Sequence, residues 1–275
     1  MLTEDNRRFM RKSTASGTLR YLLTCWKLNA AGAMEFRLSF FLTAGMMFIN
    51  NCIWLVFWGI FFTKFPVVNG WELRDVMLMW AVAAGGFGWA NMLFGNFTRV
   101  AAITAAGQLD VYLTQPKPVL LSVLASRMSL MAIGDFMFGW VIYGLVGDHS
   151  LRGLALFMLG LLISGLLIMF FTLVANSLAF YIGNAEGLAF QVFNGFLALT
   201  TYPTDIFRGG VRIILFTLVP AGFISYIPIG LLGGIQDSFL IGALGITALV
   251  AGIGIAFFYH GLRRYTSGNQ LGIRS

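Results

Sequence analysis

Long apolar runs separated by short polar segments dominate the chain. A helix that crosses a bilayer needs about 20 mostly apolar residues, and six stretches reach or approach this length. They predict an all-α membrane protein with six transmembrane helices. The predicted spans are Ser39–Phe62, Val76–Gly95, Met128–Val146, Leu154–Phe180, Gly187–Tyr202 and Phe239–Gly261.

The region between the fifth and sixth predicted spans is apolar but broken by prolines. Counting Val211–Leu232 as a further crossing would give an odd number of spans and put the two ends of the chain on opposite sides. We therefore predict that the segment from Thr204 to Asp237 stays on the outer side, as short helices that dip back toward the bilayer. Backbone at that depth must be buried in protein or line a wet cavity, which indicates a pathway or a partner. The helix-breaking residues are Pro203, Pro220 and Pro228.

Composition supports this interpretation. Of 275 residues, 58% are hydrophobic and only 11% are charged, whereas an average soluble domain carries roughly 25% charged residues. Too few polar side chains exist to coat a water-facing globule. The composition therefore excludes a soluble enzyme, a disordered protein and a disulfide scaffold.

The positive charges gather near the two ends of the chain. Lys and Arg sum to 18 and Asp and Glu to 11, a net charge of +7. The positive-inside rule then predicts that both termini are cytoplasmic, with residues 1–38 as an N-terminal segment, 39–261 as the membrane domain and 262–275 as a tail. Arg99, Lys117 and Arg127 fall on the same predicted side. No single basic soluble face is present, so the pattern does not indicate nucleic-acid binding.

A basic amphipathic helix is predicted ahead of the first span. Its apolar residues recur at i, i+3, i+4 and i+7, which places them on one helical stripe, while Arg20 and Lys27 lie on another face. Such a helix is typical of the membrane interface. It either anchors the chain to anionic lipid or forms a docking surface for a cytoplasmic partner. The stripe consists of Leu19, Leu22, Leu23 and Trp26.

The segment from Asn96 to Ser126 is too polar to span a membrane and too long for a turn. Its apolar spacing predicts two short amphipathic helices separated by Gly107, and prolines should end the second one. We expect a helical protrusion held at the cytoplasmic surface. The spaced residues are Phe97, Val100 and Thr104, then Leu109, Tyr112 and Leu113, followed by Pro116 and Pro118.

Asp135 lies in the middle of the third predicted span, and an intramembrane carboxylate is a functional hypothesis by default. Two interpretations stay open: an interhelical hydrogen bond that holds the fold, or a polar lining of a pathway. Amides in or near the spans usually join helices, with substrate contact as the alternative. The small-residue pairs Ala84/Gly88 and Ala248/Gly252 permit close helix packing. The amides are Asn50, Asn51, Asn91, Asn176, Gln191 and Asn194.

The chain carries no nucleotide-binding motif. A P-loop needs Gly-x-x-x-x-Gly-Lys followed by Ser or Thr. Only Lys12 is followed by such a residue, and Arg11 stands where the glycine should be. The two histidines, His149 and His260, fall at opposite ends of the predicted spans, so we predict no catalytic residues and no metal site.

The run from Gly107 to Pro116, Gly-Gln-Leu-Asp-Val-Tyr-Leu-Thr-Gln-Pro, resembles the G-x-L-D-x-x-L-x-x-P segment of the ABC-2 family of bacterial ABC transporter permeases. Tyr202–Phe207, and the stretch from Pro220 through Tyr226 to Pro228, are similar to the region after the fifth span in one branch of that family. The interface helix and the six predicted spans match its layout too. The resemblance therefore covers nearly the whole chain.

The resemblance implies a function. In this family two permeases pair across the membrane, each docks a cytoplasmic ATP-binding subunit, and the loop between spans two and three acts as a coupling helix. The N-terminal helix would help to seat the ATPase, which would hold ATP and Mg²⁺ while this chain holds no cofactor. The implied coupling residues are Gly107, Leu109, Asp110, Tyr112, Leu113 and Pro116, and the implied outer gate consists of Pro203, Pro220, Tyr226 and Pro228.

The leading hypothesis is thus the permease subunit of an ATP-driven exporter in a bacterial inner membrane. It would move a lipid, a glycan or an amphiphilic small molecule outward by alternating access, paired with itself or with a homologous chain. Three alternatives stay open. They are an ion-coupled secondary transporter, a membrane-bound enzyme acting on lipids and an assembly scaffold without transport.

Overall fold

The computed structural model describes residues 15–115, 117–183, 185–207, 209–226 and 237–266. Within these ranges every regular element is a helix, and the one β feature is an isolated bridge between Val68 and Trp71. This confirms the predicted all-α class.

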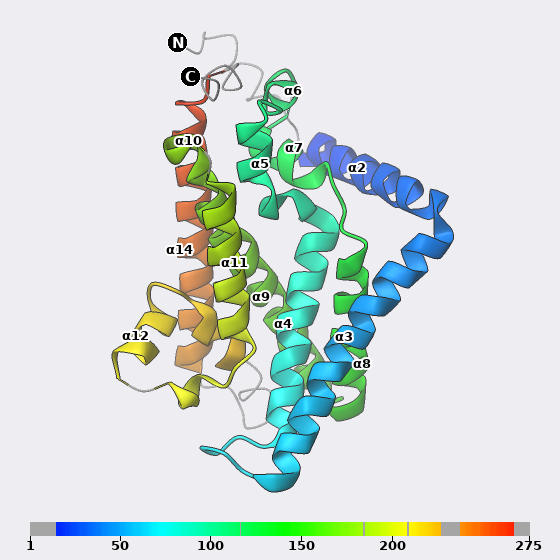
Figure 1. Ribbon diagram of the computed structural model, residues 1–275, viewed down its shortest axis with the longest axis vertical. Coiled ribbons are helices and arrows are strands. Elements are labelled where there is room, and N and C mark those ends of the chain that lie inside the picture. The colour runs from blue at the N-terminus through cyan, green and yellow to red at the C-terminus, as the bar shows by residue number, and fades with distance from the viewer. Residues whose placement is uncertain (1–14, 116, 184, 208, 227–236, 267–275) are drawn as a thin grey trace.

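Long apolar helices run along the long axis of the molecule (Figure 1). These are α3 (Arg37–Lys64), α4 (Leu73–Phe94), α8 (Met131–Val146), α9 (Leu151–Ser177), α11 (Glu186–Thr200) and α14 (Asp237–Leu262). Among the described residues, four helical stretches are long and apolar enough to cross a membrane: Arg37–Lys64, Leu73–Ala105, Leu151–Ile182 and Ser238–Leu262. The chain is therefore a multi-pass membrane protein. Helices α8 and α11, with 16 and 15 residues, are shorter.

The shorter helices cluster at the two ends of the bundle. One end, called here the α6 end, carries α2, several short helices and the last turn of α14; the opposite end, the α12 end, carries the loop between α3 and α4 and the described part of the 204–237 region (Figure 1). That part contains only short helices, none long enough to cross. At the α6 end lie α2 (Ala15–Glu35), η1 (Gly95–Thr98), α5 (Val100–Ala105), α6 (Asp110–Leu113), α7 (Val119–Ala125) and α10 (Ala179–Ile182); at the α12 end lie η2 (Thr204–Ile206) and α12 (Gly210–Phe216).

Helix α8 lies between α3 and α4 and packs extensively against both. Glycines make this possible because their lack of a side chain lets backbones approach closely. A Cβ atom placed on Gly134 would collide with the carbonyl oxygen of Ala44 in α3. On the other side, a Cβ on Gly88 of α4 would lie 2.5 Å from the backbone nitrogen of Phe136. One of the two small-residue pairs seen in the sequence, Ala84/Gly88, thus lies at a helix contact.

The start of α8 differs from the prediction. The predicted third span begins at Met128, whereas the helix begins at Met131. The preceding backbone is bonded to the end of α4: Gly95 N–H donates to the Arg127 carbonyl at 3.0 Å, and Ser129 N–H donates to the Asn91 carbonyl at 3.2 Å. The Arg127 carbonyl and the Ser129 N–H thus have hydrogen-bond partners in another segment and do not need helical hydrogen bonds.

Helix α9 joins the two halves of the bundle, because it contacts α4, α11 and α14. The indole N–H of Trp89 in α4 donates to the Leu161 carbonyl at 2.7 Å. Phe171 of α9 stacks on Phe196 of α11 with ring centroids 4.3 Å apart. The polar bond and the aromatic contact fix the position of α9 against both neighbours.

We predict that Gly88→Ala lowers the free energy of unfolding by about 1–3 kcal/mol, because overpacking a close helix contact forces backbone shifts. The matched control is Gly252→Ala in α14, where an added Cβ would meet no atom within 4 Å. Thermal unfolding of the purified variants measures both. Equal stability of the two variants would contradict the packing of α4 on α8.

Candidate functional site

A cavity of about 490 Å³, called here the polar cavity after Asp135 and the amides in its wall, lies between α3, α4 and α11, and Asp135 of α8 lines it. Aromatic rings and small apolar side chains form most of its wall, with a few polar groups among them. This combination is typical of sites that bind small molecules. Its polar and aromatic lining residues are Asn50, Asn51, Trp54, Trp58, Trp80, Phe87, Asp135, Asn194, Thr200, Thr201 and Tyr202.

Asp135 is 2% exposed and has one bonded and one unbonded carboxylate oxygen. The amide of Asn51 donates to Oδ1 at 2.7 Å and also to the Met47 carbonyl at 3.1 Å. Oδ2 is buried and has no hydrogen-bond partner among the described residues. The sequence left a structural bond and a pathway lining as alternatives for Asp135. The structure contains a feature of each: the bonded Oδ1 fits the structural interpretation, and the unbonded Oδ2 fits the pathway interpretation.

Two tryptophans add donors to the same cavity. Trp54 stacks on Trp80 with centroids 5.9 Å apart, and within the described chain the indole N–H groups of Trp58 and Trp80 are buried without an acceptor. A buried polar group that lacks a partner costs free energy. The wall of the cavity therefore contains two indole donors and one carboxylate oxygen that no described residue satisfies.

Amides also occupy the open flanks of this cavity. Asn50 of α3 and Asn194 of α11 line it yet are exposed on the isolated chain, and Gln191 is exposed one turn before Asn194. A side-chain amide facing hydrocarbon is unfavourable unless it finds a partner. The face formed by α3 and α11 is thus poorly suited to lipid.

At the α6 end, the structure divides the predicted coupling residues into a buried and an exposed set. Leu109 is 0% exposed and belongs to the main apolar core. Leu113 is 47% exposed, and Val111, which the amphipathic spacing did not single out, is 64% exposed. A charge at Leu109 would therefore disturb the core, because that side chain packs inside the protein. Val111, Leu113 and the exposed Thr114 form the outward part, called here the α6 surface.

Gly107 forms the turn that leads into α6. Its φ of +70° lies in the left-handed region that favours glycine. An added Cβ there would lie 3.8 Å from the hydroxyl of Tyr265, which follows α14. Burial raises the pKa of Tyr265 to about 12, and the nearby Asp110 carboxylate acts in the same direction. The approach of Tyr265 to Gly107 places the end of the last helix against the start of α6.

Tyr112 connects the other side of α6 to α7, because its hydroxyl lies 2.9 Å from that of Ser126 in a hydrogen bond. Helix α6 ends at Leu113, before the predicted proline stop, and Pro118 instead stands at the start of α7. Pro116 lies outside the described residues. Contacts on both sides make α6 part of a packed block.

The predicted interface helix is present as α2 and is bonded to the same block. Hydrogen bonds run from Tyr21 to Gln115, from Trp26 to the Leu93 carbonyl and from Asn29 to the Ala125 carbonyl, at 3.0, 2.8 and 3.1 Å. The predicted stripe is split by this docking. Leu22 and Trp26 are half-buried against the bundle, whereas Leu19 and Leu23 are exposed on a separate apolar strip.

At the α12 end, Asp205 joins segments that are far apart in the sequence. Its carboxylate accepts the indole N–H of Trp71 at 2.9 Å and lies 3.1 Å from the guanidinium of Arg212. Asn69 donates to its carbonyl at 3.3 Å. The sequence placed Asp205 within a family-like motif but gave it no role.

The predicted outer-gate residues lie beside this cluster. Pro203 and Pro220 are buried, and the ring of Tyr226 lies 6.4 Å from that of Trp71. Pro228 is outside the described residues. Three of the four predicted positions thus belong to one compact cap at the α12 end.

The Asn51–Asp135 contact makes a prediction about stability. Asn51→Ala should lower the free energy of unfolding by about 1–3 kcal/mol, because it leaves a buried carboxylate with no donor. The double variant Asn51→Ala/Asp135→Ala should lose less than the sum of the two single changes. Denaturant titration of the purified chain measures this, with Asn50→Ala as the exposed control. Strictly additive effects would contradict the pairing.

Comparison with known proteins agrees with this arrangement. Residues 48–269 match the model of a family described as ABC-2 family transporter protein. No curated protein and no solved structure matches the chain. The match extends from within α3 to beyond α14, so it includes all lining residues of the polar cavity except Met47 and all helices of the α6 end except α2. The chain belongs to the ABC-2 transporter family.

Proposed function

We propose that this chain is the membrane-spanning permease subunit of an ATP-driven exporter. Family membership over most of the chain carries the proposal. The separation of two features supports it: a polar cavity lies among the long helices, and an exposed apolar surface projects from one end. A transporter powered by another subunit needs both a pathway and a place for the motor to act.

In the proposed topology, α3, α4, α8, α9, α11 and α14 all cross the bilayer and both chain ends are cytoplasmic. At 1.5 Å per residue, α8 and α11 are about 24 and 22 Å long, short of the roughly 30 Å hydrocarbon core. A short hydrophobic helix is accommodated by local bilayer thinning or by neighbouring protein. For α8 that neighbour is the 127–130 segment bonded to α4.

A second permease, identical or homologous, covers the face formed by α3 and α11. The exposed amides Asn50, Gln191 and Asn194 support this, because a partner helix can satisfy them where lipid cannot. The polar cavity then lies beside the subunit boundary. Alternating closure of that boundary would open it to one side of the membrane at a time.

The ATPase docks on the α6 surface at the cytoplasmic side and supplies ATP and Mg²⁺ chemistry. Force applied at Val111 and Leu113 reaches the bundle through Leu109, which is buried in the core directly beneath. It also reaches α14 through Tyr265 and α7 through Tyr112. Asp110 and Gly107 serve this block by shaping the turn that presents the surface.

The cavity supports export of a lipid, a glycan or an amphiphilic small molecule, since it combines aromatic walls with a few polar groups. Within the described residues it holds one carboxylate, Asp135. An ion-coupled transporter would be expected to carry several intramembrane ionisable groups, so the geometry favours the ATP-driven mechanism. An assembly scaffold without transport would not require such a cavity.

The ATPase interaction can be tested at the α6 surface. We expect the pair Val111→Glu/Leu113→Glu to fold normally but to lose co-purification with the ATPase encoded alongside the chain, because charges replace an apolar contact. Leu151→Glu is the control, an exposed apolar residue at the far end of the molecule. Leu109→Asp should instead fail to fold. Unchanged ATPase binding and unchanged stimulated hydrolysis in the pair would refute the docking site.

Topology can be tested by cysteine labelling. In a background that lacks Cys25 and Cys52, Ile213→Cys should react with a membrane-impermeant maleimide in right-side-out vesicles. Thr114→Cys should react only after the vesicles are opened. Both sites are exposed in the structure. The reverse pattern would invert the proposed orientation, and labelling of both from outside would refute the even number of crossings.

A further inference from the structure

A second cavity, of about 480 Å³, lies at the α6 end where α2 and α3 diverge from the rest of the bundle. The contact between Ala44 of α3 and Gly134 of α8 lies next to it, because Thr43, the neighbour of Ala44, lines the cavity. Beyond that contact α3 leaves the bundle, and α2 returns to it across the opening (Figure 1). The cavity is distinct from the polar cavity of Asp135, which lies on the other side of the same contact.

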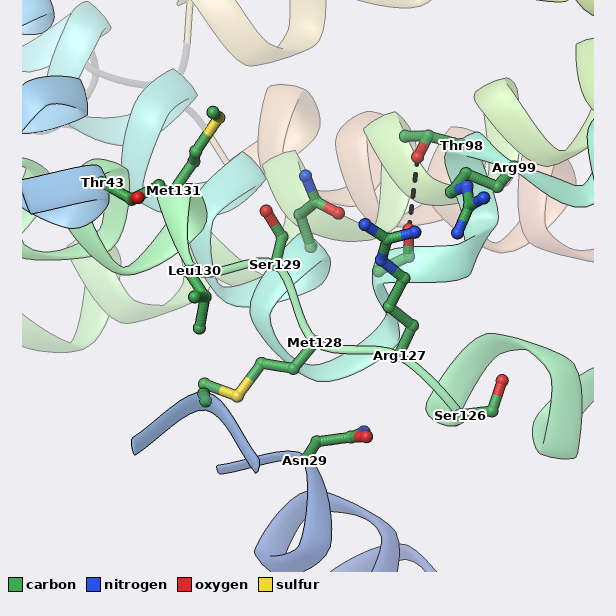
Figure 2. A pocket seen from close by; sticks show the side chains of 13 residues that line it. Asn29, Thr43, Thr98, Arg99, Ser126, Arg127, Met128, Ser129, Leu130 and Met131 are labelled. Carbon is green, nitrogen blue, oxygen red and sulfur yellow. Dashed lines mark hydrogen bonds between the residues drawn. The ribbon is translucent and has the colours of Figure 1, made fainter. Parts of the chain in front are cut away.

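Two arginines give this cavity its charge. Arg99, between η1 and α5, and Arg127, before α8, both line it, and the described lining residues include no acidic one. Figure 2 shows their guanidinium groups turned to the same side of the cavity. Within the described chain, neither guanidinium is in a salt bridge or a hydrogen bond.

Neutral polar groups complete the wall. Asn29 of α2 uses its amide nitrogen on the Ala125 carbonyl, which leaves its amide oxygen unused by that bond. Thr98 donates its hydroxyl to the Gly95 carbonyl at 3.2 Å. Asn91 and Ser129 line the same space. The guanidinium groups supply the donors that an anionic phosphate needs, and the side chains of Asn91 and Ser129 carry further donors.

The surroundings select a lipid as the source of that phosphate. Apolar surface lies close by in α3, where Leu38, Phe41 and Leu42, all within five residues of the lining residue Thr43, are each more than half exposed. Met131 lines the cavity and is 57% exposed. A free phosphate gains nothing from this surface, whereas acyl chains would cover it.

We propose that an anionic phospholipid of the cytoplasmic leaflet binds here, with its phosphate on Arg99 and Arg127 and its acyl chains along the start of α3. The leaflet follows from the proposed topology; the binding chemistry does not depend on it. The lipid fills the space between the second half of α2, the start of α3 and the segment that precedes α8. It therefore adds a contact to the interface helix, which is bonded to the same block as the α6 surface.

The test measures lipid binding to the delipidated full chain by native mass spectrometry, without the ATPase. Phosphatidylglycerol should bind the wild-type chain, and Arg99→Gln/Arg127→Gln should weaken it about ten- to thirtyfold, since each arginine near a membrane surface contributes about a fivefold factor. Phosphatidylcholine should bind weakly to both. Arg152→Gln, an exposed arginine at the α12 end, should leave phosphatidylglycerol binding unchanged.

Three results would overturn the proposal. These are equal phosphatidylglycerol binding by the wild-type chain and the double glutamine variant, an equal loss in Arg152→Gln, or displacement of the lipid by millimolar inorganic phosphate, which would indicate a soluble-anion site. If the double glutamine variant does not fold, milder variants replace it. Arg99→Lys/Arg127→Lys keeps both charges, and each single glutamine variant should lose about fivefold in phosphatidylglycerol affinity. ATPase docking is measured separately, so failure here leaves the proposed function intact.

Discussion

The close approach of α8 to α3 at Gly134 and Ala44 determines the positions of both cavities. In a bilayer, helices gain little from apolar contact alone, because lipid tails are equally apolar, and close backbone packing takes its place. Gly134 permits that packing, and the next residue in the chain is Asp135. The contact that brings the backbones together therefore also brings the carboxylate within 2.7 Å of the Asn51 amide. A larger residue at Gly134 would separate both pairs at once.

The same crossing point explains why α3 has two different inner surfaces. Toward the α12 end, α3 follows α4 and α8, and its Trp54 and Trp58 enclose the polar cavity with Trp80. Toward the α6 end it leaves them, and the space is lined by Arg99 and Arg127 instead. Only 11% of the most apolar window of α3 is buried, and the buried residues of the helix are Ala44, Asn51, Trp58 and Phe62. All four lie at or beyond the crossing point, toward the α12 end.

Hydropathy predicts the long helices well because bilayer thickness imposes a length on every crossing segment. It cannot predict contacts between segments. The pairing of Asn51 with Asp135 joins residues 84 positions apart, and the late start of α8 depends on bonds to the end of α4. Amphipathic spacing correctly placed Leu109 and Leu113 on helical turns, but it could not show that protein covers the first and leaves the second exposed. The direction of a side chain depends on its neighbours, which only the fold supplies.

Arginine position carries two kinds of information in this chain. In the sequence, Arg99 and Arg127 served as orientation signals, counted with Lys117 as positive charge on one predicted side of the membrane. In the structure, these two arginines share a cavity at the level where the helices end. The positive-inside rule needs only that the charge stays on one side, and it is satisfied whether water or a phosphate surrounds the guanidinium groups.

What separates a binding site from an orientation signal is the arrangement of the arginines. Two unpaired guanidinium groups beside an exposed apolar helix can hold one amphiphilic anion, whereas scattered surface arginines cannot. The charges that predict the orientation of the chain are therefore also suited to hold the proposed lipid.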